Sequence, residues 1–280
     1  MNMKNMKNTM KIILRTVALL TAAALLTGCV MGCAESGKNE EDHKDLLESI
    51  KEKGELTVAM EGTWSPWTYH NEKDELVGFD VEVAEYIGNF LGVKVKFVEG
   101  EWDGLFAGLD AGMYAIIVNG VDETPERAKK YDFSDPYAYI HTVLVTRKDN
   151  KKIKSFKDLK GKTTANSIGS TYMELAEKYG ATVKGVDSLG ETMTMVISKR
   201  ADATLNAEPS VLDYMKEQPD APIKIVASTK DANHVCIPIR KGKENAAFRA
   251  EINKALAEMR EDGALQALSE KYFGSDITNE

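Results

Sequence analysis

The chain has 280 residues, of which 43% are hydrophobic and 29% are charged, and its 44 acidic and 36 basic residues give a net charge of −8. These proportions are typical of a globular protein and exclude a long disordered or collagen-like chain. An acidic chain is poorly suited to phosphate backbones, so we expect no nucleic-acid partner. Three cysteines are too few for a disulfide framework.

The first 28 residues differ in composition from the rest. They contain four basic and no acidic residues, and their apolar run over 12–26 is short for a membrane span of about 20 residues. This order is typical of a secretory signal peptide. The run ends in Leu26-Thr27-Gly28-Cys29, which resembles a bacterial lipobox. We therefore expect a signal peptide over 1–28 and a lipid on Cys29; Cys33 is a second candidate, and an uncleaved anchor helix is the alternative.

A polar stretch follows the lipobox. Residues 29–53 are expected to form a lipid-anchored tether and an initial helix, because their composition cannot bury a core. Loss of residues 1–28 would change the net charge from −8 to −12. The remaining cysteine, Cys236, lies in an apolar run and is expected to be a buried small hydrophobic residue.

The body of the chain alternates strand and helix patterns. Strands are predicted over 56–60, 93–97, 114–118, 163–166, 182–186, 202–206 and 223–227, and helices over 79–91, 102–111, 170–179, 190–199 and 209–218. The last segment is predicted to be helical, with Phe248, Ile252, Leu256 and Met259 on one apolar face and Gly263 at its end. This order predicts an α/β protein with parallel sheets and helices on their faces.

Two strand-like segments, 139–147 and 232–240, could join the two α/β units. Two such connections predict a discontinuous first lobe over 54–140 and 236–280 and a second lobe over 141–235. Each lobe is expected to hold a mainly parallel sheet. Ligands bind outside the carboxyl ends of parallel strands, so a cleft between the two lobes is the expected binding site.

Aromatic residues gather where two predicted strands end. Trp64 and Trp67 follow Glu61 after the first strand, and Trp102 follows the second. Rings at this edge could form the walls for an apolar or zwitterionic ligand and contact a cation. The alternative for each ring is a place in the core.

Arg127 is a candidate carboxylate ligand. Thr124 and Pro125 predict a helix start that places Arg127 in the first turn, and its planar fork matches a carboxylate. A surface ion pair is the alternative. In the second unit Ser170 and Thr171 begin another helix, with capping-box spacing from Thr171 to Glu174, and its free N–H groups could hold an anion.

Catalytic and metal-binding patterns are absent from the sequence. The four histidines have no metal-ligand spacing, and there is no P-loop, G-x-S-x-G or G-x-G-x-x-G after a strand. We therefore expect no cofactor, no metal and no catalytic residue.

Several stretches of the chain, taken together and in order, resemble solute-binding family 3, the binding proteins of polar amino acid ABC importers. The resemblance covers about residues 54–275 and rests on the order of GTWSPWTYHNEKDELVGFDVEVAEYIG, WDGLFAGLDAG, NGVDETPERAKKYDFSDPY, LKGK, GSTYMELAEKYGA, RADATLN and MREDGALQALSEKYFG. The first stretch is most similar to the cystine-binding branch. The family implies a two-lobe, type II periplasmic-binding-protein fold in a monomeric, extracytoplasmic lipoprotein. It also implies that this protein closes on an amino acid and delivers it to a membrane permease with an ATPase.

The resemblance also implies roles for single residues. Arg127 would hold the α-carboxylate with help from Thr171. The other implied contacts are Glu61, Trp64 and Trp102 around the side chain and Asn119, Gly120 and Asp122 at the first-lobe edge.

Two positions depart from the family pattern: Ala115 stands where an aspartate commonly precedes the apolar run of the third strand, and the second lies at the expected site. An aspartate that grips the α-amino group usually follows the residue equivalent to Asn206, and here that position is Ala207. We assign the α-amino group to Asp122 first and Glu208 second; a ligand that is not a standard amino acid is the alternative. The three tryptophans favour a bulky or sulfur-containing ligand side chain over a strongly charged one. The alternatives are a dehydratase-type enzyme on the same fold, which turnover would reveal, and a ligand-sensing domain.

Overall fold

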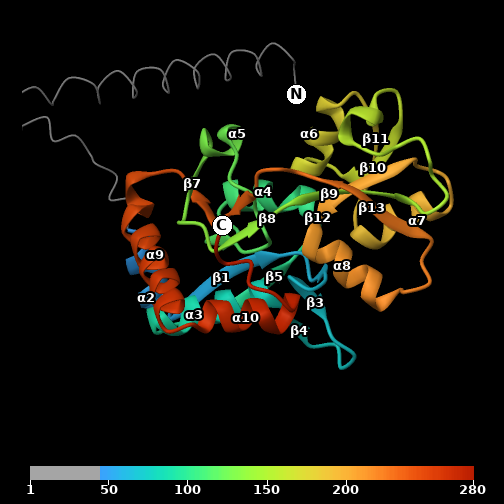
Figure 1. Ribbon diagram of the computed structural model, residues 1–280. Helices are drawn as coiled ribbons and strands as arrows, with labels where there is room; N and C mark the ends of the chain where they lie inside the picture. Colours follow the sequence, from blue (N-terminus) through green and yellow to red (C-terminus); the bar gives the residue numbers. More distant parts are fainter. Residues whose placement is uncertain (1–44) are drawn as a thin grey trace, which may run out of the picture. The chain divides into compact units, whose positions relative to one another are not determined.

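The computed structural model describes residues 45–280 (Figure 1). The predicted signal peptide, Cys29, Cys33 and most of the tether lie outside the described residues. The predicted initial helix is α2 (Leu46–Lys53), which begins after Asp45, whose carboxylate accepts a hydrogen bond from the Leu47 N–H. Side-chain capping of this kind satisfies an N–H group that has no partner within the helix.

Sheet 1 has the strand order β5-β1-β6-β15-β7. Its strands are β1 (Glu55–Met60), β5 (Lys94–Glu99), β6 (Ile116–Ile117), β7 (Tyr131–Phe133) and β15 (Pro238–Arg240). The helices of this part of the chain are α3 (Phe79–Leu91), α4 (Trp102–Asp110), α5 (Pro125–Ala128), the short η2 (Lys243–Asn245), α9 (Ala246–Glu261) and α10 (Ala264–Phe273). The predicted helical tail is divided at Gly263, whose φ of 78° ends one helix before the next begins. The four apolar residues predicted on one face of that tail are all buried.

Sheet 2 has the strand order β11-β10-β12-β9-β13. Its strands are β9 (Thr142–Arg147), β10 (Thr163–Ser167), β11 (Thr182–Val186), β12 (Ala203–Ala207) and β13 (Ile223–Ser228). The helices here are η1 (Phe156–Leu159), α6 (Thr171–Lys178), α7 (Leu189–Ile197) and α8 (Glu208–Glu217). The apolar strand residues Val143, Val145 and Ala165 are fully buried with helix residues such as Met193 in a second core.

Each sheet is mainly parallel, as predicted, with one strand that runs against the other four. In sheet 1, β1 is parallel to β5 and β6, but β15 is antiparallel to β6 and β7. In sheet 2, β10 is parallel to β11 and β12, but β9 is antiparallel to β12 and β13. The antiparallel strands belong largely to the segments that connect the two sheets, and hydrophobic periodicity carries no information about strand direction.

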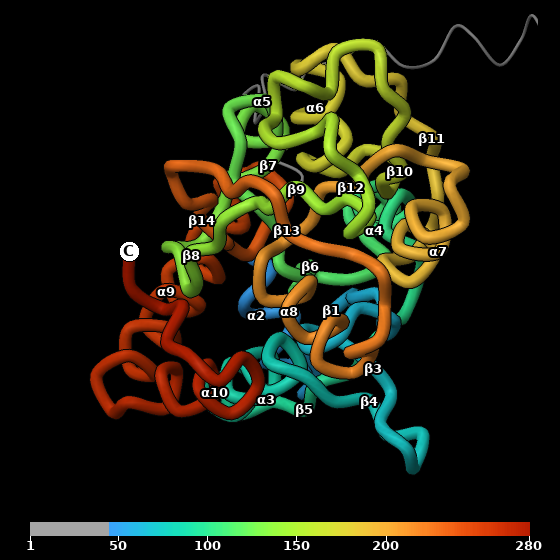
Figure 2. The backbone as a smooth tube through the Cα atoms, turned by 45° about the vertical axis from the view of Figure 1, so that its right-hand side comes forward, coloured from blue at the N-terminus to red at the C-terminus, as the bar shows by residue number. Residues whose placement is uncertain are grey.

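The two connecting segments lie side by side (Figures 1 and 2). In one, β8 (Ala138–Ile140) leads into β9; in the other, β13 is followed by β14 (Asn233–Val235), which pairs antiparallel with β8. All strands of sheet 2 come from 141–235, and those of sheet 1 come from the flanking segments. This distribution supports the predicted lobe boundaries, which stay a prediction.

The aromatic-rich loop after β1 contains strands that were not predicted. It forms a three-stranded sheet of β2 (Thr63–Trp64), β3 (Thr68–His70) and β4 (Leu76–Val77). These strands are two or three residues long, too short for an alternating pattern to be recognised. The small sheet fixes the direction in which Trp64 and Trp67 point.

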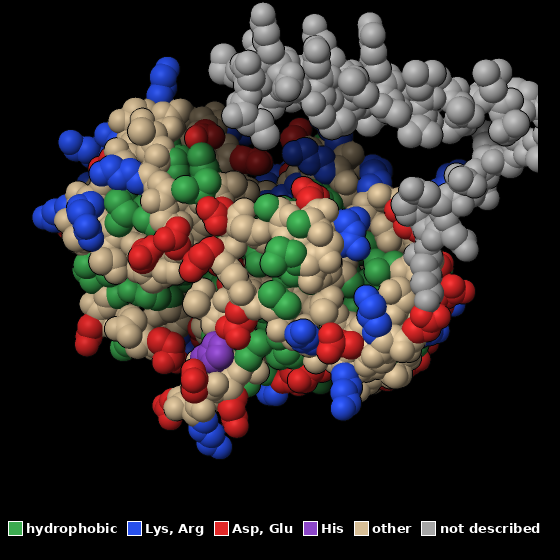
Figure 3. Space-filling view, turned by 180° about the vertical axis from the view of Figure 1, so that it is seen from behind, with side chains coloured by type: hydrophobic (Ala, Val, Ile, Leu, Met, Phe, Trp, Pro, Cys, Tyr) green, Lys and Arg blue, Asp and Glu red, His purple; other side chains and the backbone are tan. Residues whose placement is uncertain are grey.

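The surface carries both signs of charge. On the face in Figure 3, acidic and basic side chains are interspersed with small apolar patches. Within residues 45–280, none of the helices has the length and apolar character needed to span a bilayer. Cys236 is 1% exposed, as predicted for a small core residue.

Candidate functional site

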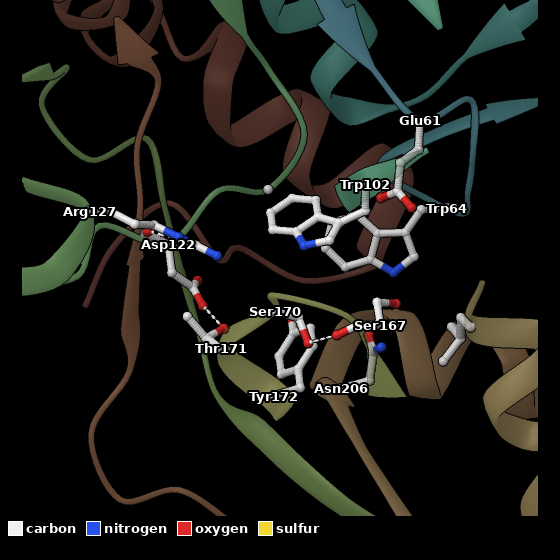
Figure 4. A pocket seen from close by; sticks show the side chains of 12 residues that line it. Glu61, Trp64, Trp102, Asp122, Arg127, Ser167, Ser170, Thr171, Tyr172 and Asn206 are labelled. Carbon is white, nitrogen blue, oxygen red and sulfur yellow. Dashed lines mark hydrogen bonds between the residues drawn. The ribbon is translucent and has the colours of Figure 1, made fainter. Parts of the chain in front are cut away.

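A pocket lies at the carboxyl ends of parallel strands from both sheets. Figure 4 shows side chains from both parts of the chain facing one another across it. The lining residues are Glu61, Trp64, Trp102, Gly120, Asp122, Arg127, Ser167, Ser170, Thr171, Tyr172, Leu189 and Asn206.

The guanidinium of Arg127 is held in a fixed orientation at one end of this pocket. Thr124 caps α5 by accepting a hydrogen bond from the Arg127 N–H at 3.2 Å, as predicted. The guanidinium lies 5.4 Å from the ring centre of Trp102 and 5.1 Å from that of Phe106. Its Nη1 donates to the Asp122 carbonyl oxygen at 2.9 Å and its Nη2 to the Gly169 carbonyl oxygen at 3.3 Å. These contacts orient the cation, because aromatic faces and carbonyl oxygens attract it on several sides.

Asp122 is a buried carboxylate beside Arg127. Its Oδ2 accepts hydrogen bonds from Thr171 Oγ1 at 2.5 Å and from Asn233 Nδ2 at 3.1 Å. Its Oδ1 is buried and has no hydrogen-bond partner among the described residues. Burial raises the pKa of Asp122 to about 6, while the Thr171 hydrogen bond and the nearby Arg127 act in the opposite direction. A buried carboxylate oxygen of this kind favours a cationic hydrogen-bond donor.

The start of α6 differs by one residue from its prediction. Ser170, not Thr171, is the N-cap, and its hydroxyl accepts a hydrogen bond from the Met173 N–H at 3.1 Å. The predicted capping box from Thr171 to Glu174 is therefore wrong. The shift leaves the Thr171 hydroxyl available to reach Asp122 across the pocket.

Glu61 lies at the opposite end of the pocket from Arg127 and Asp122 (Figure 4). Asn119 holds it in two places: the amide Nδ2 donates to Glu61 Oε2 at 2.7 Å, and Oδ1 accepts from the Glu61 N–H at 2.8 Å. Thr68 Oγ1 also donates to Asn119 Oδ1, at 3.2 Å. Burial raises the pKa of Glu61 to about 7, and the Asn119 hydrogen bond partly opposes this.

Two predicted tryptophans have different surroundings. Trp64 lines the pocket, whereas Trp67 is fully buried and does not line it. The Trp67 ring stacks on Trp64 at 5.3 Å and also packs against Phe79 and Phe273. Trp67 therefore supports the pocket wall from the core, and its predicted place at the ligand is corrected.

Gly120 lies so close to the Trp64 ring that the pocket leaves no room for a side chain at this position. It has a φ of 55°, and a Cβ built on it would lie 2.5 Å from Cζ3 of the Trp64 ring. Its N–H donates to Asp80 Oδ2 at 2.6 Å, and the hydroxyl of Tyr137 donates to Asp80 Oδ1 at 2.8 Å. Asp80 is fully buried, and this burial raises its pKa to about 7. The buried network fixes a backbone conformation that glycine adopts without strain.

Direct contacts link elements of the two sheets. The Trp67 Nε1 donates to Ser210 Oγ on α8 at 3.0 Å, and Ser65 Oγ donates to Asp213 Oδ2 at 2.8 Å. The contacts of Arg127 with Gly169 and of Thr171 with Asp122 also join the two parts. The cleft is therefore closed over the pocket in this structure.

The other predicted contacts lie outside the lining. Asn119 is completely buried behind Glu61, which it positions. Glu208 is the first residue of α8, next to the fully buried Ala207, and does not line the pocket. Ser167, Tyr172 and Leu189 line the pocket but were not predicted. Among residues 45–280, no group of three or more His, Cys, Asp or Glu residues could hold a metal ion.

Comparisons with known proteins agree with this geometry. Residues 56–275 match the sequence model of the bacterial extracellular solute-binding proteins, family 3. The L-cystine-binding protein TcyA of Bacillus subtilis (strain 168) is 41% identical over 270 residues, which cover 96% of this chain and 100% of TcyA.

Two solved structures are also similar. An ancestral arginine-binding protein bound to arginine gives a TM-score of 0.74 at 38% identity and covers 79% of this chain and 99% of its own. The L-cystine solute receptor of Neisseria gonorrhoeae, in its unliganded open conformation, gives a TM-score of only 0.57. It is nevertheless 42% identical, and the match covers 84% of this chain and 99% of the receptor chain. The arginine-bound structure thus superposes better despite its lower identity, in line with the closed cleft.

Proposed function

Because the chain belongs to the bacterial extracellular solute-binding proteins of family 3, we propose that its pocket binds an amino acid outside the cytoplasm. The protein then delivers this amino acid to the permease of an ABC importer, which is driven by an ATPase. Relatives that are named as amino-acid-binding proteins support this function. The site observation that carries the proposal is the oriented guanidinium of Arg127 beside Asp122 Oδ1, which has no hydrogen-bond partner within residues 45–280.

Arg127 holds the α-carboxylate of the ligand. Its guanidinium is already fixed by two aromatic rings and two carbonyl oxygens, so little conformational entropy is lost when the ligand binds. The first turn of α6 faces the pocket from the other sheet, and its backbone N–H groups add further donors.

Asp122 holds the α-ammonium group. Its buried Oδ1 lacks a partner among the described residues, and an ammonium group would donate to it. This assignment replaces the aspartate that the family pattern places at Ala207. Glu208, the second candidate, lies outside the pocket lining.

Calorimetry with a panel of the twenty standard amino acids and cystine tests this function. We expect saturable binding of at least one compound, and recovery of that compound unchanged distinguishes a binding protein from a dehydratase-type enzyme. Arg127→Ala should weaken binding by roughly 2–5 kcal/mol, about 30- to 4,000-fold, because the ligand carboxylate loses its charged partner.

The matched control is Arg147→Ala. Arg147 donates to Asp149 and to the Val196 carbonyl oxygen, and it is not among the pocket residues. This variant should bind within about twofold of wild type. If Arg127→Ala binds as tightly as Arg147→Ala, the carboxylate clamp is wrong.

The predicted location also remains part of the proposal. We place the protein on the outer side of the cell membrane as a monomer, held by a lipid on Cys29 and the tether over 29–53. The order of basic, apolar and lipobox residues supports this anchor.

A further inference from the structure

One short segment of the chain carries a strong excess of basic residues. Of the 36 basic and 44 acidic residues in the chain, eight basic and two acidic ones lie within residues 147–162, the basic segment. The rest of the chain is therefore more acidic than its overall charge suggests. The basic segment runs from the end of β9 through η1 to the residue before β10. It takes no part in the pocket, whose lining contains none of its residues.

Buried apolar side chains fix the basic segment and leave its lysines outside. Ile153, Phe156 and Leu159 recur at intervals of three residues and are all buried. The ring of Phe156 stacks on that of Tyr179, which follows α6, with ring centres 5.5 Å apart. The core therefore fixes the backbone from which the lysines project. The lysines next to these apolar residues are exposed: Lys151, Lys152, Lys154, Lys157 and Lys160.

The positive charge of the basic segment is not neutralised from within. Asp149 pairs with the guanidinium of Arg147, and its Oδ1 lies 3.1 Å from Nε. Asp158 accepts hydrogen bonds from the N–H groups of Lys154 and Ser155, so its carboxylate stabilises the local backbone. In the part of the chain that the structure describes, no ion pair involves a lysine of this segment. Like charges repel one another, so an anionic partner over them relieves this repulsion.

The basic segment lies at the edge of sheet 2 opposite the pocket. It leads into the amino end of β10, whereas Ser167, at the carboxyl end of the same strand, lines the pocket. Asp202 also lies at this edge, since its carboxylate accepts a hydrogen bond from the Thr163 N–H at 2.9 Å. The exposed Lys199 and Arg200 come shortly before it and enlarge the basic surface. A partner on this surface does not cover the pocket.

The chemistry of this surface favours an extended anionic layer over a single bound anion. A site for one phosphate or carboxylate needs converging donors, which the fork of an arginine provides best. Arg147, the arginine of the segment, already donates to Asp149 and to the Val196 carbonyl oxygen. The other cations of the segment are lysines, which act as hydrated point charges on flexible stems. Clusters of such lysines bind anionic lipid surfaces, where each one contributes separately.

We propose that the basic segment docks the protein against an anionic lipid membrane. This docking rests on the proposed function for its setting, because a lipid on Cys29 keeps the domain beside a membrane. Residues 29–44 can extend to about 55 Å, whereas a domain of this size has a radius of gyration of about 18 Å. The anchor therefore allows any face to reach the lipid. Anionic headgroups repel the acidic rest of the chain, so charge selects the basic segment as the contact.

Vesicle sedimentation tests this docking without the lipid anchor. The processed chain over 29–280, which contains every described residue, is made without its lipid. It is mixed with vesicles of phosphatidylcholine alone or of equal parts phosphatidylcholine and phosphatidylglycerol. At about 0.1 M salt its partition coefficient should be at least about tenfold higher on the anionic vesicles, because each lysine near such a surface contributes about fivefold. At about 1 M salt, where the Debye length is about 3 Å, this difference should disappear.

A variant with four substitutions tests whether the basic segment makes the contact. It carries Lys151→Gln, Lys152→Gln, Lys154→Gln and Lys157→Gln. The partition coefficient on anionic vesicles should fall at least about tenfold. All four side chains are exposed, so the fold is retained, and arginine at the same four positions should keep binding within about threefold.

The matched control removes the same number of charges from exposed lysines elsewhere. It carries Lys73→Gln, Lys94→Gln, Lys129→Gln and Lys130→Gln. This variant has the same net charge as the first one, and its partition coefficient should stay within about threefold of wild type.

The outcomes separate docking from amino-acid binding. If the wild-type chain binds neither kind of vesicle or both equally, or if the control loses as much binding as the basic-segment variant, docking is overturned. Binding to soluble polyphosphate without binding to anionic vesicles also overturns it, in favour of an anionic polymer. Calorimetry with amino acids is performed on the same preparation. A chain that binds an amino acid but no vesicle refutes docking alone, and one that binds anionic vesicles but no amino acid refutes the proposed function alone.

Discussion

Ser210→Ala should weaken ligand binding, although Ser210 does not line the pocket. Trp67 Nε1 donates to Ser210 Oγ at 3.0 Å, and both residues are completely buried. When the cleft is open, water can satisfy the indole N–H. When it is closed around an alanine, that N–H has no partner, and a buried unsatisfied donor costs about 1–3 kcal/mol. The substitution therefore disfavours the closed state.

The size of the effect follows from the population of the closed state. If the open state predominates without ligand, the dissociation constant rises by the same factor as the closed fraction falls. A cost of about 1–3 kcal/mol corresponds to a factor of about 5 to 150. Calorimetry measures this factor, and small-angle scattering at saturating ligand should still show the closed form. A ligand shifts this equilibrium only through contacts that it makes better in the closed state.

Thr204→Val is the matched control for Ser210→Ala. Thr204 is also fully buried, but its Oγ1 donates to the Ala165 carbonyl oxygen within sheet 2. This variant should lower the free energy of unfolding without changing affinity by more than about twofold. If Ser210→Ala folds normally and binds within twofold of wild type, the closure argument is refuted.

Three further predictions concern other parts of the molecule. Burial raises the pKa of Asp80 from 3.8 to about 7. The folded state therefore binds a proton at this carboxylate more tightly than the unfolded chain does. The contribution of Asp80 to the free energy of unfolding thus increases as the pH falls from 7 to 4. In Asp80→Asn this pH-dependent contribution, at most about 4 kcal/mol, should be absent. Urea unfolding at several pH values between 4 and 7 measures the difference from wild type. Gly120→Ala should cost about 1–3 kcal/mol in stability or affinity, measured by urea unfolding and calorimetry, because a Cβ would lie 2.5 Å from the Trp64 ring. Cys29→Ser should abolish incorporation of labelled fatty acid in a bacterial host, and labelling that persists would indicate Cys33.

Hydrophobic periodicity was sufficient to predict most elements of the fold. The predicted strand over 182–186 is β11, and the predicted helix over 79–91 is α3. Strand direction was not predictable in the same way: β9 and β15 are apolar, as a central parallel strand would be, yet both run antiparallel to their neighbours. Their direction depends on where the chain crosses between sheets, which is a tertiary property.

A site residue could be predicted where helix-start signals in the sequence fix the position of its side chain. It could not be predicted where tertiary packing decides which way the side chain points. Arg127 was found because Thr124 and Pro125 fix the start of its helix. Trp64 and Trp67 are equally aromatic and only three residues apart, yet the hairpin turns one toward the pocket and the other into the core. Tyr172 could have been found from its place in the first turn of α6, whereas nothing in the sequence around Leu189 indicated a pocket.

The proposed assignment of the α-ammonium group to Asp122, with Ala207 at the position of the usual aspartate, places both charged contacts on one side of the cleft. An aspartate after Asn206 would belong to sheet 2, whereas Asp122 belongs to the same part of the chain as Arg127. In the proposed binding mode, the side that contains sheet 1 therefore supplies the charged partners of both the α-carboxylate and the α-ammonium group. Sheet 2 supplies Thr171, which donates to Asp122 at 2.5 Å. We therefore expect the ligand to bind first to the open sheet 1 side, and Thr171 then to hold the cleft closed through the same carboxylate that holds the ligand.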